Sequence, residues 1–237
     1  MPFRILSLDG GGIRGLVAAK ILATIEKQIQ QPLNKYFNLI SGTSTGSILA
    51  AAVATGSRSE KIVELYKQKS SVIFPYKSRF SLQRIPLLIK YGLSIYSAID
   101  GGVAANNPSA CAVAEALRLG YKVEEITVLS IGTGDRTRII PFEKAQGWGL
   151  IEWAQPLIGV LLEASSDIYE YITNQVMHQR VLRLQFKLDR ELTGKRLSDD
   201  IDDVSEENIN NLIEAAEVYI NQPYVQSALQ QFLEISQ

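Results

Sequence analysis

The sequence predicts a single α/β domain over residues 1–237, with a mainly parallel central sheet flanked by helices. Short aliphatic runs alternate with amphipathic segments of helical period, and two of these runs enter glycine-rich turns that open a helix. The composition, 46% hydrophobic with a formal net charge of −1, is typical of a globular protein with a sizeable core. In such sheets the functional loops gather at the carboxyl ends of the strands.

The first unit is a strand, a turn and a helix. Residues 3–8 form an aliphatic run that predicts a buried strand, and residues 9–15 form the glycine-rich turn that follows it. Over residues 16–29, apolar side chains recur at helical spacing with polar residues between them, so we expect one amphipathic helix.

The same unit then repeats. A second strand over residues 36–41 enters a Gly-Thr-Ser-Thr-Gly turn and an alanine-rich helix over about 48–54. Later in the chain we expect a helix over 112–119, strands over 126–131 and 181–186, and a C-terminal packing helix over 205–217 that begins with Ser205.

Composition excludes several classes of function. One cysteine cannot form an internal disulfide or a thiolate zinc site, and one histidine rules out centres built from several histidines. The near-neutral charge lacks the basic excess of a dedicated nucleic-acid-binding protein. We therefore expect no metal, no organic cofactor and no nucleic-acid partner.

The location follows from the apolar segments and the charges. The N-terminus lacks a secretion signal and no stretch is long enough to cross a bilayer, so we expect a cytoplasmic protein. Residues 58–90 carry eight basic and two acidic side chains interleaved with aromatic and aliphatic ones, which could contact anionic lipid headgroups at the membrane periphery. Alternatively, this is a solvated face balanced by the acidic C-terminal half.

The turn after the second strand fits the nucleophile-elbow pattern G-x-S-x-G, with Ser44 at its centre. Its other members are Gly42, Thr43, Thr45 and Gly46. Small flanking residues permit a sharp turn that presents the serine hydroxyl at the end of the sheet, next to a helix N-terminus that favours negative charge. Without that role, the segment would be a polar loop that caps a helix.

The turn after the first strand, Gly10-Gly11-Gly12-Ile13-Arg14-Gly15, has two interpretations. It matches the dinucleotide fingerprint G-x-G-x-x-G, but that function needs an acidic residue after the next strand, and no acid occurs between Lys27 and Ser59. In the second interpretation, its backbone N–H groups point at an oxyanion beside the serine. We favour the second.

A serine nucleophile needs a base, and the chain offers two. Asp100 precedes Gly101 and Gly102 and stands shortly before Asn106-Asn107-Pro108. The alternative is His178, which would give the Ser-Asp-His order of α/β-hydrolases. Its surroundings predict the end of a helix, where a lone histidine is more often a partner of the helix dipole.

Three motifs together resemble the patatin-like phospholipase family: the Asp9–Gly15 turn, the Ser44 elbow and the Asp100-Gly101-Gly102 segment. Residues 131–134 and the region from residue 183 to the terminal helix are also similar to that family. The resemblance implies a three-layer α/β fold and a lipid acyl hydrolase that acts on phospholipids, galactolipids or lysolipids. It further implies Ser44 as nucleophile, Asp100 as base, and an oxyanion hole formed by Gly10, Gly11, Gly12, Ile13 and Arg14.

The chain departs from the family pattern in one respect. Members usually have a much longer segment between nucleophile and aspartate, whereas only 55 residues separate Ser44 from Asp100 here. The sequence reads as though a block were removed between about residues 92 and 97. A second hypothesis is therefore a catalytically impaired patatin-like module that binds lipid or protein.

Overall fold

The computed structural model describes residues 2–74, 101–135 and 140–236, and within these ranges it contains one sheet of four strands, all parallel. The strands are β1 (Phe3–Leu8), β2 (Leu39–Gly42), β3 (Ile126–Ile131) and β4 (Val181–Leu184). They are arranged in the order β2-β1-β3-β4. Leu8 pairs with both Gly42 and Ile131, so the carboxyl ends of β1, β2 and β3 lie level at one edge of the sheet.

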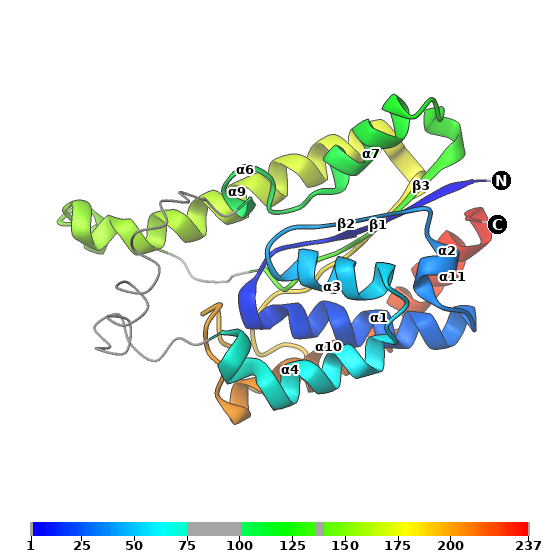
Figure 1. Ribbon diagram of the computed structural model, residues 1–237. Coiled ribbons are helices and arrows are strands. Elements are labelled where there is room, and N and C mark those ends of the chain that lie inside the picture. The colour runs from blue at the N-terminus through cyan, green and yellow to red at the C-terminus, as the bar shows by residue number, and fades with distance from the viewer. Residues whose placement is uncertain (1, 75–100, 136–139, 237) are drawn as a thin grey trace, which may run out of the picture.

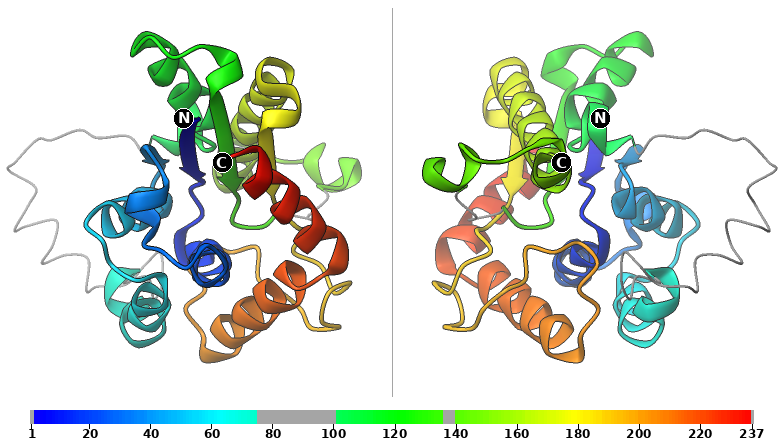
Figure 2. Two further views of the ribbon diagram at one scale, coloured as in Figure 1. Left: turned by 90° about the vertical axis from the view of Figure 1, so that its right-hand side faces the viewer. Right: turned by 90° about the vertical axis from the view of Figure 1, so that its left-hand side faces the viewer.

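Helices cover both faces of the sheet, as Figures 1 and 2 show. On one face lie α1 (Gly15–Ile29), α2 (Leu33–Tyr36), α3 (Thr45–Ala54), α4 (Ser59–Ile73), α10 (Glu206–Ile220) and α11 (Pro223–Ile235). On the other lie α6 (Gly102–Ala105), α7 (Ser109–Arg118) and α9 (Leu150–Met177), with short α8 (Phe142–Ala145) before α9. This arrangement confirms the predicted three-layer α/β fold.

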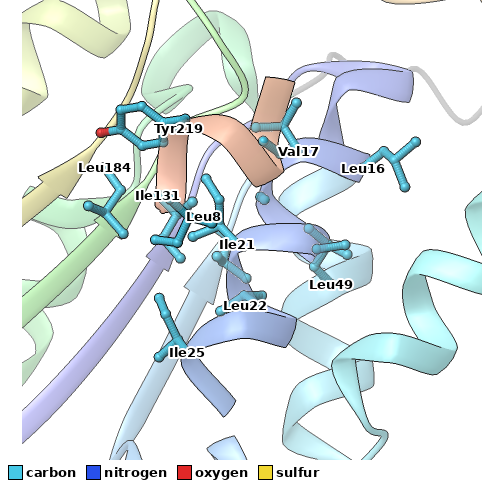
Figure 3. Close-up of a cluster of buried hydrophobic side chains, with 14 of the residues drawn as sticks. Leu8, Leu16, Val17, Ile21, Leu22, Ile25, Leu49, Ile131, Leu184 and Tyr219 are labelled. Atoms are coloured by element: carbon cyan, nitrogen blue, oxygen red, sulfur yellow. The ribbon is translucent and has the colours of Figure 1, made fainter. Parts of the chain in front are cut away.

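The alternation of side chains along the strands produces two cores. Leu6 and Leu8 of β1 face the larger core, where the apolar side of α1 packs between the sheet and α3, α4 and α10. Figure 3 shows part of this cluster, including Ile21 and Leu49. Phe3 and Ile5 face the smaller core beneath α7 and the end of α9. Removing these side chains from water is the main contribution to the stability of the three layers.

Several boundaries differ from those predicted. The second strand was expected to begin at residue 36, but Tyr36 ends the short helix α2 and β2 begins only at Leu39. Tyr36 and Phe37 reach the core from this helical turn and not from a strand. β4 ends at Leu184, α3 begins at Thr45, and a second helix, α11, follows α10. Of the 28-residue helix α9, only the end near His178 was predicted, since Pro156 interrupts the pattern of the rest. No helix among the described residues is long and apolar enough to span a membrane.

Candidate active site

The carboxyl edge of the sheet holds a pocket to which every strand contributes. β1 leads into the glycine loop, defined as residues 10–12, β2 leads to Ser44, and segments after β3 and β4 complete the floor. Helix α9 covers one side. The lining residues are Asp9, Gly10, Gly11, Gly12, Arg14, Ser44, Asn106, Thr133, Gly134, Asp135, Gly159, Leu162, Glu163, Ser166, Gln185 and Ile201.

Ser44 occupies a strained position between β2 and α3. Its backbone has φ 51° and ψ −121°, a conformation that costs a non-glycine residue about 1–3 kcal/mol. The flanking glycines explain how the turn closes: a Cβ on Gly42 would lie 2.1 Å from the Gly46 carbonyl oxygen, and one on Gly46 would lie 2.2 Å from that of Leu8. The result is an exposed serine side chain at the start of a helix.

The two threonines of the turn fix it to its neighbours. The Thr43 hydroxyl donates to the carbonyl of Ala105, at the end of α6, over 2.6 Å. The hydroxyls of Thr45 and Tyr66 share a buried hydrogen bond of 2.5 Å, which ties the turn to α4. These threonines therefore hold the backbone that carries Ser44.

The glycine loop lies beside Ser44, since a Cβ on Gly10 would approach the Ser44 Cβ to 3.3 Å. Of the five residues assigned to the oxyanion hole, three have engaged amides. The N–H groups of Gly10, Ile13 and Arg14 donate to the carbonyls of Asn106, Ile201 and Gly11 over 3.1, 2.8 and 3.1 Å. Within the described part of the chain, the N–H groups of Gly11 and Gly12 have no acceptor. These two donors are available to an anionic oxygen.

A buried ion pair that sequence reasoning missed lies directly behind the loop. The guanidinium of Arg183, on β4, donates to both carboxylate oxygens of Asp9 over 2.9 and 2.5 Å, and also to Ser130 and Glu170. The side chains of Arg183 and Asp9 are 9% and 2% exposed. Burial raises the pKa of Asp9, and the charge of Arg183 opposes that shift. An arginine inside the predicted strand over residues 181–186 was the signal in the sequence.

Asp135 is a second carboxylate of the pocket that the sequence did not single out. Gln185 donates to its Oδ1 over 2.7 Å and accepts the Gly134 N–H over 2.9 Å. Burial raises the pKa of Asp135, while Arg183 and Gln185 act in the opposite direction. Because Asp135 follows β3, whereas Ser44 follows β2 on the far side of β1, the two groups come from strands that are not adjacent.

His178 lies at the other end of the sheet from Ser44. It follows the last residue of α9, is exposed, and precedes β4. Since all the strands are parallel, a residue before β4 lies toward the amino edge, and Ser44 lies at the carboxyl edge. The structure therefore places His178 at a helix end, remote from the pocket.

Asp100 lies outside the described residues, as does the 92–97 segment. The chain that follows Asp100 is described: Gly101 is exposed, and Gly102 begins α6. The end of α6 reaches the site through two contacts already noted, from Thr43 to Ala105 and from Gly10 to Asn106. Of the basic segment 58–90, residues 58–74 are described, and Lys61, Lys67 and Lys69 are exposed on helix α4. Among the described residues, no three or more His, Cys, Asp or Glu side chains gather in a group that could hold a metal ion.

Comparison with known proteins gives consistent matches. The family model "Patatin-like phospholipase" matches residues 6–87. Patatin-like protein 2 of Oryza sativa subsp. indica is 23% identical over 344 residues, which cover 92% of this chain and 83% of that protein. Two phospholipases match shorter parts. The cGAMP-activated phospholipase of Vibrio cholerae is 37% identical over 101 residues, covering 35% of this chain and 28% of its own length. Phospholipase A I of Arabidopsis thaliana is 43% identical over 72 residues, covering 30% and 6%.

Proposed function

We propose that this chain is a patatin-like protein that hydrolyses fatty-acyl esters of glycerolipids through an acyl intermediate on Ser44. The observation that carries the proposal is the juxtaposition, in one pocket, of a strained exposed serine and the unengaged N–H groups of Gly11 and Gly12. A serine nucleophile beside backbone donors suits acyl transfer, where negative charge develops on the carbonyl oxygen. The matches to phospholipases support a lipid ester as substrate.

Asp100 is the base that we propose for this reaction. Among the described carboxylates of the pocket, Asp9 is paired with Arg183 and Asp135 comes from a strand not adjacent to that of Ser44. The third, Glu163, comes from helix α9 and not from the loops that carry Ser44 and the glycine loop. His178 lies toward the opposite edge of the sheet. Asp100 immediately precedes the segment whose end contacts both the elbow and the glycine loop, which supports a carboxylate within reach of Ser44.

The reaction then proceeds in two steps. Asp100 takes the proton of the Ser44 hydroxyl as its oxygen bonds to the ester carbon, and the N–H groups of Gly11 and Gly12 stabilise the oxyanion. The bond to the alcohol breaks, and Asp100 returns the proton to the leaving alkoxide. Asp100 next deprotonates a water molecule whose oxygen attacks the acyl carbon. The bond to the Ser44 oxygen then breaks, Asp100 returns the proton to that oxygen, and the fatty acid is released.

Acyl release from phospholipids, galactolipids and lysolipids tests the proposal. We expect the wild type to hydrolyse at least one of these classes, and Ser44→Ala and Asp100→Asn to lose the activity while remaining folded. His178→Ala is the matched control and should retain near-wild-type turnover. Hydrolysis by Ser44→Ala would end the proposal, and loss of activity in a folded His178→Ala would show that histidine takes part.

Contact with a lipid surface also belongs to the proposed function, for a cytoplasmic protein that binds membranes at their periphery. Helix α9, which extends beyond the sheet in Figure 1, lines the pocket through Gly159 and Leu162. The same helix exposes Leu157, Leu161 and Ile168 at spacings of four and seven residues, which place them on one side of the helix. We expect Leu157→Glu with Leu161→Glu to reduce co-sedimentation with phospholipid vesicles, and unchanged co-sedimentation would exclude this surface.

The second candidate function is a lipid- or protein-binding module with an impaired site, within one domain shortened between about residues 92 and 97. The comparison with Patatin-like protein 2 favours a shortened chain. The alignment spans 344 positions but includes only 92% of the 237 residues of this chain, so large gaps must fall within this chain. A fluorophosphonate probe separates the two functions. An activated Ser44 reacts with it, and Ser44→Ala provides the blank, whereas an impaired module remains unlabelled.

A further inference from the structure

Thr133 contacts the glycine loop from the neighbouring strand. It follows β3, is 4% exposed, and its hydroxyl donates to the Gly10 carbonyl over 2.8 Å in a buried hydrogen bond. The loop lies directly on this side chain, since a Cβ on Gly11 would come within 2.2 Å of the Thr133 Oγ1. Both residues line the pocket that contains Ser44.

The bond from Thr133 determines where one of the two free amides points. The Gly10 carbonyl and the Gly11 N–H belong to the same planar trans peptide and point in opposite directions. Holding the carbonyl toward Thr133 therefore directs the Gly11 N–H away from it. Consecutive glycines have wide conformational freedom, so a loop of this composition requires an external contact to keep one peptide orientation.

The second free amide is held differently. The Gly11 carbonyl accepts the backbone N–H of Arg14 over 3.1 Å and the Nε of the same residue over 3.4 Å, so Arg14 orients the Gly12 N–H. Only the Gly11 N–H depends on a side-chain hydroxyl, so the two donors respond differently to a substitution at residue 133.

Thr133 itself is held rigidly on both sides. The N–H of Gly132 donates to the Leu184 carbonyl over 2.9 Å, and Gly134 donates to Gln185 and accepts from Arg14. The hydroxyl is therefore presented from a fixed backbone, as a group that orients a catalytic donor must be.

We propose that Thr133 is a positioning residue for ester hydrolysis, which holds the Gly10–Gly11 peptide so that the Gly11 N–H faces the developing oxyanion. The inference rests on the proposed function. Thr133 does not touch the reacting atoms, and its contribution appears only when negative charge forms on the carbonyl oxygen. Substrate binding before that point is unaffected.

Two substitutions isolate the hydroxyl. Thr133→Val keeps the shape and removes the donor, and Thr133→Ser keeps the donor and removes a methyl group. Loss of one oxyanion donor lowers kcat by about 10²–10³ in serine hydrolases, so a misdirected donor should lower kcat by at least about tenfold in Thr133→Val. We expect KM to change less than about twofold, since the loss falls on the transition state, and Thr133→Ser to retain most of the wild-type kcat.

A trifluoromethyl ketone analogue provides an independent readout, because its adduct with Ser44 carries an oxyanion. Its affinity should fall in Thr133→Val in parallel with kcat, whereas the affinity of an unreactive ether analogue of the substrate should not. If Thr133→Val does not fold, Thr133→Ala and Thr133→Ser give the same comparison, since they differ only in the hydroxyl.

The outcomes separate this inference from the proposed function. If the wild type shows no Ser44-dependent hydrolysis, the proposed function and the role of Thr133 both fail. If hydrolysis depends on Ser44 but folded Thr133→Val keeps kcat within about twofold, only the positioning role is overturned. A loss of kcat in Thr133→Ser as large as that in Thr133→Val also overturns it.

Discussion

Replacing Arg183 with methionine removes the positive half of the buried ion pair behind the glycine loop. The pair is two-pronged, with hydrogen bonds of 2.9 and 2.5 Å to the two carboxylate oxygens of Asp9. Because the Asp9 side chain is only 2% exposed, its charge loses its partner without gaining solvent. Breaking a buried pair from one side costs about 3–5 kcal/mol. For a chain of this length that lowers Tm by roughly 10 °C.

The assay is urea unfolding of four proteins: the wild type, Arg183→Met, Asp9→Asn and the double variant. We expect the double variant to be more stable than Arg183→Met alone, because Asp9→Asn removes the charge that the single change leaves unpaired. In Arg183→Met the folded pKa of Asp9 lies above its unfolded value. The folded state then favours the protonated carboxyl, and the destabilisation shrinks as the pH falls below that folded pKa.

Two results would refute this reasoning. One is a free energy of unfolding for Arg183→Met within about 1 kcal/mol of the wild-type value near neutral pH. That would mean that the Asp9 carboxylate is not buried as an unpaired charge. The other is a double variant no more stable than Arg183→Met. Arg183→Lys is the matched control. It should lose less stability than Arg183→Met, because it keeps the positive charge and loses only the two-pronged geometry.

Three further predictions concern the elbow, a helix cap and a buried phenol. Gly42→Ala should destabilise the protein and abolish fluorophosphonate labelling, because the new Cβ would lie 2.1 Å from the Gly46 carbonyl oxygen. Gly147→Ala is the control: its Cβ would meet no atom within 4 Å, so labelling should be unchanged. Ser205→Ala should cost about 1 kcal/mol in urea unfolding, since its hydroxyl caps α10 at the Asn208 N–H, and an equal loss in exposed Ser227→Ala would contradict this. Burial raises the pKa of Tyr219 to about 12, so the folded state favours the protonated phenol. Its contribution to stability is present below its ordinary pKa of 10.0 and is lost as the pH rises toward 12. Tyr219→Phe should therefore reduce the loss of stability at alkaline pH by about 2–3 kcal/mol.

The agreement between prediction and structure is greatest where the pattern is local. β1 and β3 have the predicted bounds because each is a mainly apolar run buried on both faces, which is typical of a parallel strand. The turn around Ser44 was also recognisable, since its glycines are required by close approach of the backbone. Most of the long helix α9, apart from its end near His178, was missed because Pro156 and exposed apolar residues obscure the amphipathic pattern on which prediction depends.

The sequence by itself determined the chemistry that the chain carries: a serine between small residues after a strand, a run of glycines after another, and too few histidines and cysteines for a thiolate zinc site or a centre of several histidines. Tertiary structure decided which of these groups work together. Parallel strands bring Ser44 and the glycine loop to one edge and leave His178 toward the other. Hydrogen bonds to residues more than 90 positions away decide which amides of the glycine loop stay free, as with Gly10 and Asn106. Such pairings arise from the packing of distant strands and helices, and so no local pattern encodes them.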